Sequence, residues 1–463
     1  MIGIRDYSNT LLMQFLVVTL WVLMLSVTLV ESDAYRYAAI VLIFYALFGS
    51  VREEKYFPGD WLAALCVLSG TVVITRFIID LAMTGERGAS EWLYAFPILF
   101  PFLGSALIKS WHASKGVFFA FFLLAMIMII VSTQWVPIAN GERGFPLFHH
   151  NPIHGAVGCG FLLVGAFYWA AHHYEVGSSR TTRAVVSIIA SIIIPLALFN
   201  IYGSKSKGVW LALIPALILM FLSIFMYLRV KTALIVVVIG LVLLCGSIYW
   251  VSDHLVDVVG PTVKSTMSMI KNFDGGSSVF TVLEQTTASQ DTPPSMNERL
   301  QLWSNALEVI AAAPVFGSGN GWLTLWHSTH YAAIPYTLLH NGYFEILVRH
   351  GLFGLIISGV IFLTGLHRVH RASSQGIISK SACACYVTCA IFFAFTILSN
   401  SNNRLALGES FALLFGAVCF ACSKMMRLGL ASHDDGVSSR GHQEVLLYPL
   451  RTPIKRKGMR HDR

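Results

Sequence analysis

Continuous apolar runs of about twenty residues recur along this chain, and they restrict its fold more than any other feature. As an α-helix, a run of that length crosses a hydrocarbon core about 30 Å thick. The runs do not alternate between apolar and polar residues, which excludes a β-barrel. Charged residues make up only 12% of the chain, well below the fraction in soluble proteins. We therefore expect an all-α polytopic membrane protein.

The sequence predicts about twelve transmembrane helices. Their expected ranges are 11–30, 37–50, 61–83, 92–108, 116–132, 153–171, 184–202, 208–228, 233–251, 350–367, 382–400 and 405–423. They divide the chain into an N-terminal bundle of about nine helices, a large outer loop with amphipathic helices, a C-terminal group of helices and a basic, disordered tail: 1–251, 252–349, 350–425 and 426–463.

The distribution of Lys and Arg sets the expected orientation, because cytoplasmic loops carry more of both. Every second short loop has at least two: Arg52 and Lys55; Lys109 and Lys115; Arg180 and Arg183; Arg229 and Lys231; Arg368, Arg371 and Lys380. This pattern predicts cytoplasmic termini and an external large loop. The net charge of +8 then reflects topology and contact with anionic membrane lipids, and it gives no reason to propose nucleic-acid binding.

The large loop has two parts. Residues 252–297 are expected to be loosely structured apart from a short helix near 259–272. An amphipathic helix is predicted over 298–313, followed by a turn that contains Gly317, Gly319 and Gly321. A second amphipathic helix begins at His340, contains an i,i+4 pair of Glu345 and Arg349, and leads into the span after Gly351.

Three ionisable positions expected on the outer side are candidates for chemistry. Lys207 lies with Lys205 in a turn before a helix, where close backbone approach and the helix dipole favour an anion, although a plain hydrophilic turn fits equally well. Arg299 begins the loop helix, a position that a solvated arginine also occupies. His340 lies at a helix end near the interface, where an imidazole serves as a base or as a structural residue.

Other features carry less weight. Arg76 and Asp80 are interpreted as a structural pair within the third span. No metal site is predicted, because neither a Cys nor a paired carboxylate completes the cluster of His149, His150 and His154. The remaining candidates for substrate binding are Lys205, Arg143, Arg404, Gly317, Gly319, Asn341 and Tyr336.

Several of these blocks, in this order, resemble the O-antigen ligase and polymerase family over roughly residues 140 to 365. The blocks are Asn151-Pro152-Ile153; Ser206-Lys207-Gly208; Arg299 to Trp303; Pro314 to Gly321; and His340-Asn341 to Gly351. The resemblance implies a bacterial inner-membrane enzyme with about a dozen helices and one large periplasmic loop. It departs from the family at Lys207, where the family has arginine. Lysine keeps the charge but loses bidentate geometry, which Lys205 or Arg404 would have to compensate.

The resemblance further implies glycosyl transfer from an undecaprenyl-pyrophosphate-linked glycan to an acceptor hydroxyl, without a nucleotide sugar, a metal or another cofactor. In a ligase, the acceptor is the lipid A–core of lipopolysaccharide. Arg299 and Lys207 would then bind the pyrophosphate, and His340 would deprotonate or orient the acceptor, with inversion at the anomeric carbon.

Three alternatives remain open. An O-antigen polymerase or a protein O-oligosaccharyltransferase would use the same donor chemistry with a different acceptor. A transporter or flippase of a lipid-linked anionic solute would place its charges in midplane helices, whereas the candidate charges here gather at the ends of spans.

Overall fold

The computed structural model describes residues 11–48, 59–89, 91–227, 252–276, 278–334 and 338–434, with scattered positions between 231 and 249. Regular structure in this part of the chain is helical, apart from one isolated bridge between Val30 and Phe148. Eight of these helices are long and apolar enough to cross a membrane. The prediction of an all-α polytopic membrane protein is confirmed.

Within the described residues, the membrane bundle has eight long spans and three shorter apolar helices. The predicted span 233–251 falls almost wholly outside these residues. The shorter helices are α1 (Leu11–Ser26), α2 (Ala34–Phe48) and α16 (Lys380–Thr396). The long spans are α3 (Trp61–Thr84), η2 (Glu91–Leu99) continued by α4 (Phe100–Lys109), η3 (Trp111–Ala113) continued by α5 (Ser114–Ser132), α7 (Pro152–Glu175), α8 (Arg180–Gly203), α9 (Lys207–Tyr227), α15 (Gly342–Ser374) and α17 (Ala406–Asp434).

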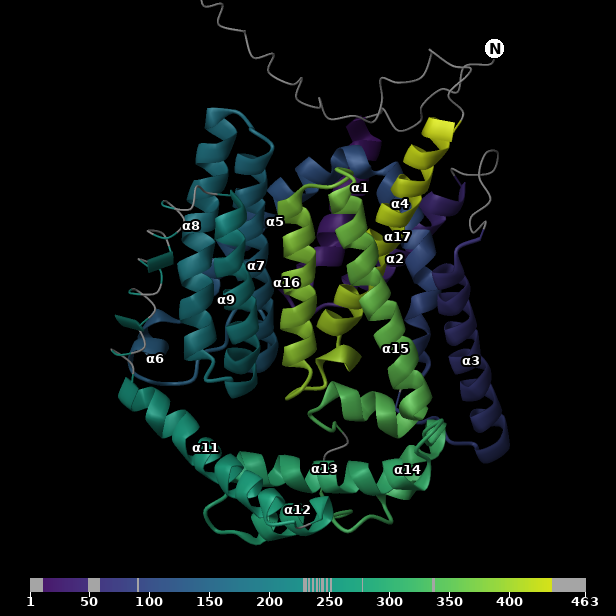
Figure 1. Ribbon diagram of the computed structural model, residues 1–463, viewed down its shortest axis with the longest axis vertical. Coiled ribbons are helices and arrows are strands. Elements are labelled where there is room, and N and C mark those ends of the chain that lie inside the picture. Colours follow the sequence, from purple (N-terminus) through teal and green to yellow (C-terminus); the bar gives the residue numbers. More distant parts are fainter. Residues whose placement is uncertain are drawn as a thin grey trace, which may run out of the picture.

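Helices α7 and α17 form the interior of the bundle (Figure 1), because small residues let their neighbours approach closely. A Cβ at Gly160 of α7 would overlap the ring of Phe392 on α16, and one at Gly104 of α4 would overlap Phe420 of α17. In a bilayer, where lipid tails are as apolar as leucine, such close packing is the main force between helices.

The large loop forms a layer of helices across one end of the bundle (Figure 1), which we call the loop layer. It consists of α11 (Ser252–Asp274), α12 (Val279–Ala288), α13 (Pro294–Ala312), η4 (Gly319–Gly321) and α14 (Trp322–Trp326). The expectation of a loose stretch up to residue 297 is wrong. Ser278 caps α12, whose Val282 and Leu283 are buried, so tertiary packing orders a segment with a weak local signal.

Helix α15 has two parts, as the sequence predicts. Gly351 has φ +61° and ψ −164°, and this non-helical residue separates a first helix of about two turns from the long span. At the other terminus, α17 continues past the expected boundary at 426 to Asp434, and Arg427 in this extension lies 3.4 Å from Asp60. Residues 435–463 of the expected tail lie outside the described residues. A short helix α6 (Trp135–Ala139) follows α5.

Candidate functional site

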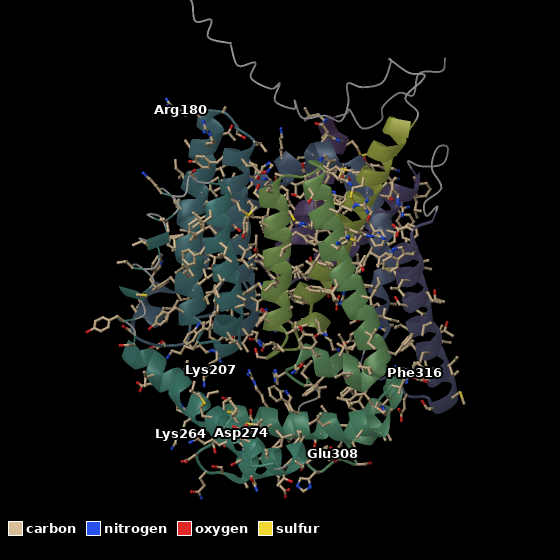
Figure 2. The ribbon with its side chains drawn as sticks, in the orientation of Figure 1. Arg180, Lys207, Lys264, Asp274, Glu308 and Phe316 are labelled. Atoms are coloured by element: carbon tan, nitrogen blue, oxygen red, sulfur yellow. The ribbon has the colours of Figure 1, made fainter. Side chains whose placement is uncertain are left out.

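Lys207 is the first residue of α9 and lies where the bundle meets the loop layer (Figure 2). The preceding residue, Ser206, accepts the first backbone hydrogen bonds of that helix, from Val209 and Trp210. The Lys207 Nζ donates to Thr262 Oγ1 of α11 at 2.7 Å. The ammonium group therefore reaches out of the bundle toward the loop layer.

Arg299 lies in the first turns of α13 and is half-buried. It has no ion pair or hydrogen bond to any of the residues that the structure describes. Its charge acts on two other candidates, Lys207 and His340. Burial lowers the pKa of Arg299, which the neighbouring Glu298 partly offsets, and an arginine remains protonated at any physiological pH.

His340 has a strained backbone, with φ +50°, that its neighbours hold in place. The Leu339 N–H donates to Glu345 Oε1 at 2.9 Å, and the Leu339 carbonyl accepts from Trp303 Nε1 at 3.0 Å. On the other side, Asn341 caps α15 by accepting from two backbone N–H groups. Because Trp303 is one turn beyond Arg299 on α13, the same contact fixes the imidazole relative to that arginine. Strain of this kind is characteristic of functional residues.

The His340 imidazole is kept neutral. Burial lowers its pKa from the ordinary histidine value, and the Arg299 guanidinium lowers it further, while Glu345 and Glu298 act in the opposite direction. No hydrogen bond engages the ring within the described residues. A neutral half-buried imidazole beside the Arg299 guanidinium is suited to accept a proton from a bound ligand.

Two other sequence candidates, Arg143 and Lys205, make contacts that hold the turn before Lys207 in place. Arg143 Nε donates to the Ser204 carbonyl at 2.9 Å, and Lys205 Nζ donates to the Gly141 carbonyl. Lys205 lines a cavity of about 150 Å³ together with Asp257 of α11. Both side chains thus hold the turn against residues 141–144. The charge of Arg299 acts on Lys207 and His340 instead.

Arg404 lies in a different environment, a buried ion network. Its Nη1 is 3.2 Å from Glu345 Oε2, and its Nη2 donates to the Ala89 carbonyl. Glu345 also pairs with Arg349, as its spacing in the sequence predicts, and Arg349 pairs with Glu91. Asn341 uses its side chain as a helix cap, and Tyr336 lies outside the described residues.

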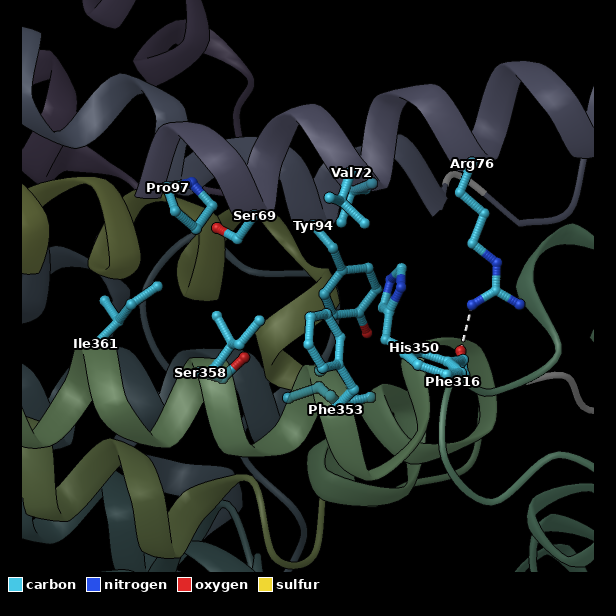
Figure 3. Close-up of a pocket in the computed structure, with 14 residues that line it drawn as sticks. Ser69, Val72, Arg76, Tyr94, Pro97, Phe316, His350, Phe353, Ser358 and Ile361 are labelled. Atoms are coloured by element: carbon cyan, nitrogen blue, oxygen red, sulfur yellow. Dashed lines mark hydrogen bonds between the residues drawn. The ribbon is translucent and has the colours of Figure 1, made fainter. Parts of the chain in front are cut away.

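Gly317 and Gly319 form part of a turn that is clamped to α3. Both have positive φ, +69° and +55°. Arg76 donates to the carbonyls of Phe316 and Gly317, as Figure 3 shows for Phe316, and Asp80 accepts from the backbone of the turn. The pair of Arg76 and Asp80, 3.7 Å apart, confirms the structural interpretation. In this structure, the two glycines allow close approach of protein to protein.

A cavity of about 300 Å³ lies between α3, η2 and α15 (Figure 3). Its lining is mainly apolar and includes Val72, Phe353 and Ile361, with Arg76 and His350 at the end nearer the loop layer. It does not include the cationic cluster, by which we mean Arg299 and Lys207 with the adjacent His340.

Thr262 was not among the sequence candidates. It is 55 residues from its partner Lys207, and no local pattern marks that contact.

The three residues of the cationic cluster all fall within residues 190–358, a segment that matches the O-antigen ligase family. No curated protein matches the chain. The O-antigen ligase match implies a glycosyltransferase-type enzyme that works with lipid-linked glycans, embedded here in a multi-pass membrane protein.

Proposed function

We propose that this protein transfers a polysaccharide from undecaprenyl pyrophosphate to the lipid A–core of lipopolysaccharide. Transfer occurs at the periplasmic side of the bacterial inner membrane, with both termini in the cytoplasm and residues 252–349 as the catalytic loop. The observation that carries this proposal is that Arg299 lies within electrostatic range of both Lys207 and His340, which come from separate stretches of the segment that matches the O-antigen ligase family.

Arg299 and Lys207 bind the pyrophosphate of the donor. As the anomeric C–O bond breaks, its electron pair goes to the pyrophosphate oxygen, and preorganised cations stabilise that developing charge. Arg299 has no carboxylate partner in the described chain, so its guanidinium is available to an anion. The first N–H groups of α9, beside Lys207, add the positive end of a helix dipole.

His340 acts on the acceptor. Its neutral imidazole takes the proton of an acceptor hydroxyl while that oxygen forms the new bond to the anomeric carbon. Undecaprenyl pyrophosphate leaves from the opposite face, and a single displacement inverts the anomeric configuration. Arg299 assists because its charge keeps the imidazole unprotonated and ready to accept a proton.

The apolar cavity between α3 and α15 suits a hydrocarbon chain of one of the two lipid substrates. Its volume of about 300 Å³ accommodates part of such a chain, and its polar end at Arg76 and His350 lies toward the loop layer. This arrangement keeps the chain in the bundle and the headgroup near the turn at Gly317.

The test is transfer by the purified protein in detergent, with lipid-linked polysaccharide as donor and polymer-free lipopolysaccharide as acceptor, followed on gels. We expect His340→Ala to lose at least about 100-fold in rate, the usual contribution of a general base. His327→Ala is the matched control, because it removes an exposed histidine from the same loop layer. Full activity of His340→Ala would contradict the assignment, and absence of product with the wild type would favour a transporter.

A gene deletion separates ligase from polymerase. Loss of all polymer from the lipopolysaccharide core supports the ligase, whereas a core that keeps a single repeat unit indicates a polymerase. Unchanged lipopolysaccharide together with underglycosylated periplasmic protein indicates a protein O-oligosaccharyltransferase.

A further inference from the structure

A second group of chemically active side chains lies apart from the cationic cluster, around the residues that follow α1 and precede α7. Glu31, His149 and His154 each offer one ligand atom, and these atoms lie within 4.8 Å of one another. The Glu31 Oε1 is 3.8 Å from His154 Nδ1, and the two imidazole rings are nearly perpendicular, with centroids 6.5 Å apart. Glu31, from a distant part of the chain, supplies the carboxylate ligand that the sequence around the histidines does not provide.

Backbone contacts bring these residues together. The bridge of Val30 and Phe148 is closed by hydrogen bonds from Phe148 N to Leu29 O at 3.0 Å and from Glu31 N to Phe148 O at 3.4 Å. Asn151 then caps α7, which places His154 in the first turn of that helix. The group is therefore held by ordered backbone from two distant parts of the chain.

The His149 side chain is only 5% exposed and has one nitrogen engaged. Its Nε2 lies 3.4 Å from the Thr28 carbonyl, to which it donates, while Nδ1 is buried without any partner among the described residues. Buried nitrogens normally have a partner, so this one calls for an explanation. In metal sites, an imidazole that ligates through one nitrogen commonly donates from the other to a backbone carbonyl.

The protonation state of His149 also fits a ligand. When Nε2 donates to the Thr28 carbonyl in the neutral ring, Nδ1 carries a free lone pair. The second oxygen of Glu31 accepts from the His150 backbone N–H at 3.4 Å, which orients the carboxylate. A simple ion pair of Glu31 with His154 would leave the His149 Nδ1 unexplained.

We propose that Glu31, His149 and His154 bind a divalent transition-metal ion, with Zn²⁺ favoured by the His₂Glu ligand set. Ligand atoms in a tetrahedral zinc site lie about 3.3 Å apart, so the three side chains close on the ion by movements of about 1 Å. A water molecule completes the coordination.

The ion has a structural role in this proposal. It ties the end of α1 to the segment before α7, whose Arg143 and Gly144 donate to the carbonyls of Ser204 and Gly203 in the turn that carries Lys207. Metal binding thus stabilises the support of the cationic cluster and takes no part in glycosyl transfer, so the two proposals stand or fall separately.

The experiment uses the full chain in detergent, purified without a histidine tag and treated with a chelator. Titration with Co²⁺ should give the visible absorption of a tetrahedral site, displaced by one Zn²⁺ per chain, and Zn²⁺ should raise the Tm by about 2 °C or more. His149→Ala should weaken metal binding at least about 100-fold, since it removes one of three ligands.

Two variants make the test specific. Glu31→Gln keeps the size of a half-exposed side chain and should also lose the Co²⁺ spectrum, even if His149→Ala fails to fold. His150→Ala removes an exposed neighbouring imidazole and should bind metal as the wild type does. The proposal is overturned if the wild type binds no Co²⁺, or if Glu31→Gln binds it unchanged.

Discussion

Two sets of charged side chains lie near the same end of this molecule, and they differ in whether a carboxylate is within reach. In the ion network, Arg349 is fully buried between Glu91 and Glu345, and Arg404 is 3.2 Å from Glu345. In the cationic cluster, Arg299 has no such partner among the described residues. An arginine with its charge already neutralised holds the protein together, whereas an unneutralised one attracts an anion from outside.

The two sets are joined through one residue. Glu345 accepts from Ser401 Oγ and from the Leu339 N–H, directly before His340, in addition to its two arginines. The ion network therefore helps to fix the strained backbone at His340. The ion network thus positions residues, whereas the cationic cluster is proposed to react with substrates. Mutations in the first should mainly lower stability, and mutations in the second should mainly lower the rate of transfer.

The largest expected effect is on folding, from Arg349→Ala. This substitution leaves the buried Glu91 without its guanidinium partner and leaves Glu345 with Arg404 alone, at a cost of about 3–5 kcal/mol in the free energy of unfolding. We expect a strongly lowered Tm and a low yield of folded protein in detergent. Arg371→Ala, an exposed arginine on the same helix, is the control. Equal Tm values for the two variants would show that the ion network does not stabilise the fold.

Arg299→Ala should give the opposite result. Because this arginine has no hydrogen bond or ion pair with the residues that the structure describes, its removal should change the Tm by no more than about 1 °C. Transfer should fall about 100-fold or more, the loss expected when a preorganised charge is removed from a transition state. Arg299→Lys should recover part of the rate, since it keeps the charge and loses the bidentate fork.

The control for Arg299→Ala is Lys264→Ala, which removes a largely exposed cation from α11 of the loop layer. A loss of stability in Arg299→Ala that matches its loss of transfer would assign the arginine to the scaffold.

The sequence predicted the helical class and most of the spans because apolar length is a local property. It also found the pair of Glu345 and Arg349, which is one helical turn apart. It could not distinguish Arg404 from Arg299 by residue type, because the partner of Arg404 is 59 residues away. The same limit hid Glu31, which lies 118 residues before His149.

Long-range packing also explains the missed helices of the loop layer. Helix α12 has only ten residues, too few to be stable in isolation, and it forms because Val282 and Leu283 are buried against α11 and α13. Local patterns contain no information on such a partner. The sequence did place Lys207 and His340 at helix starts and Arg299 near the start of an amphipathic helix, while their shared role in one site stays a prediction.

Lys207→Arg tests a smaller difference within the cationic cluster. The O-antigen ligase and polymerase family that the sequence resembles has arginine at this position, and the substitution keeps the charge, so initial rates of transfer should stay within about threefold of the wild type. Lys207→Met has a similar volume without the charge and should lose at least about tenfold. If both variants are equally active, the ammonium group serves only its hydrogen bond to Thr262.

The smallest effect is a shift in pH dependence, from Glu298→Gln. The exposed Glu298 carboxylate raises the pKa of His340, against the lowering by burial and Arg299. Removing it lowers that pKa, and a base must be unprotonated, so the acid limb of the rate profile should move to lower pH. At pH 7 the rate should change less than about twofold, because His340 is already neutral.

The control is Glu284→Gln, which removes an exposed carboxylate on α12 and should leave the pH profile of the rate in place. If His340 worked in its protonated form, as an acid or an anion ligand, the rate would instead fall as the pH rises through its pKa, and Glu298→Gln would move that basic limb to lower pH. A profile with such a limb would contradict the role of His340 as a base and make it a third positive charge beside the two cations.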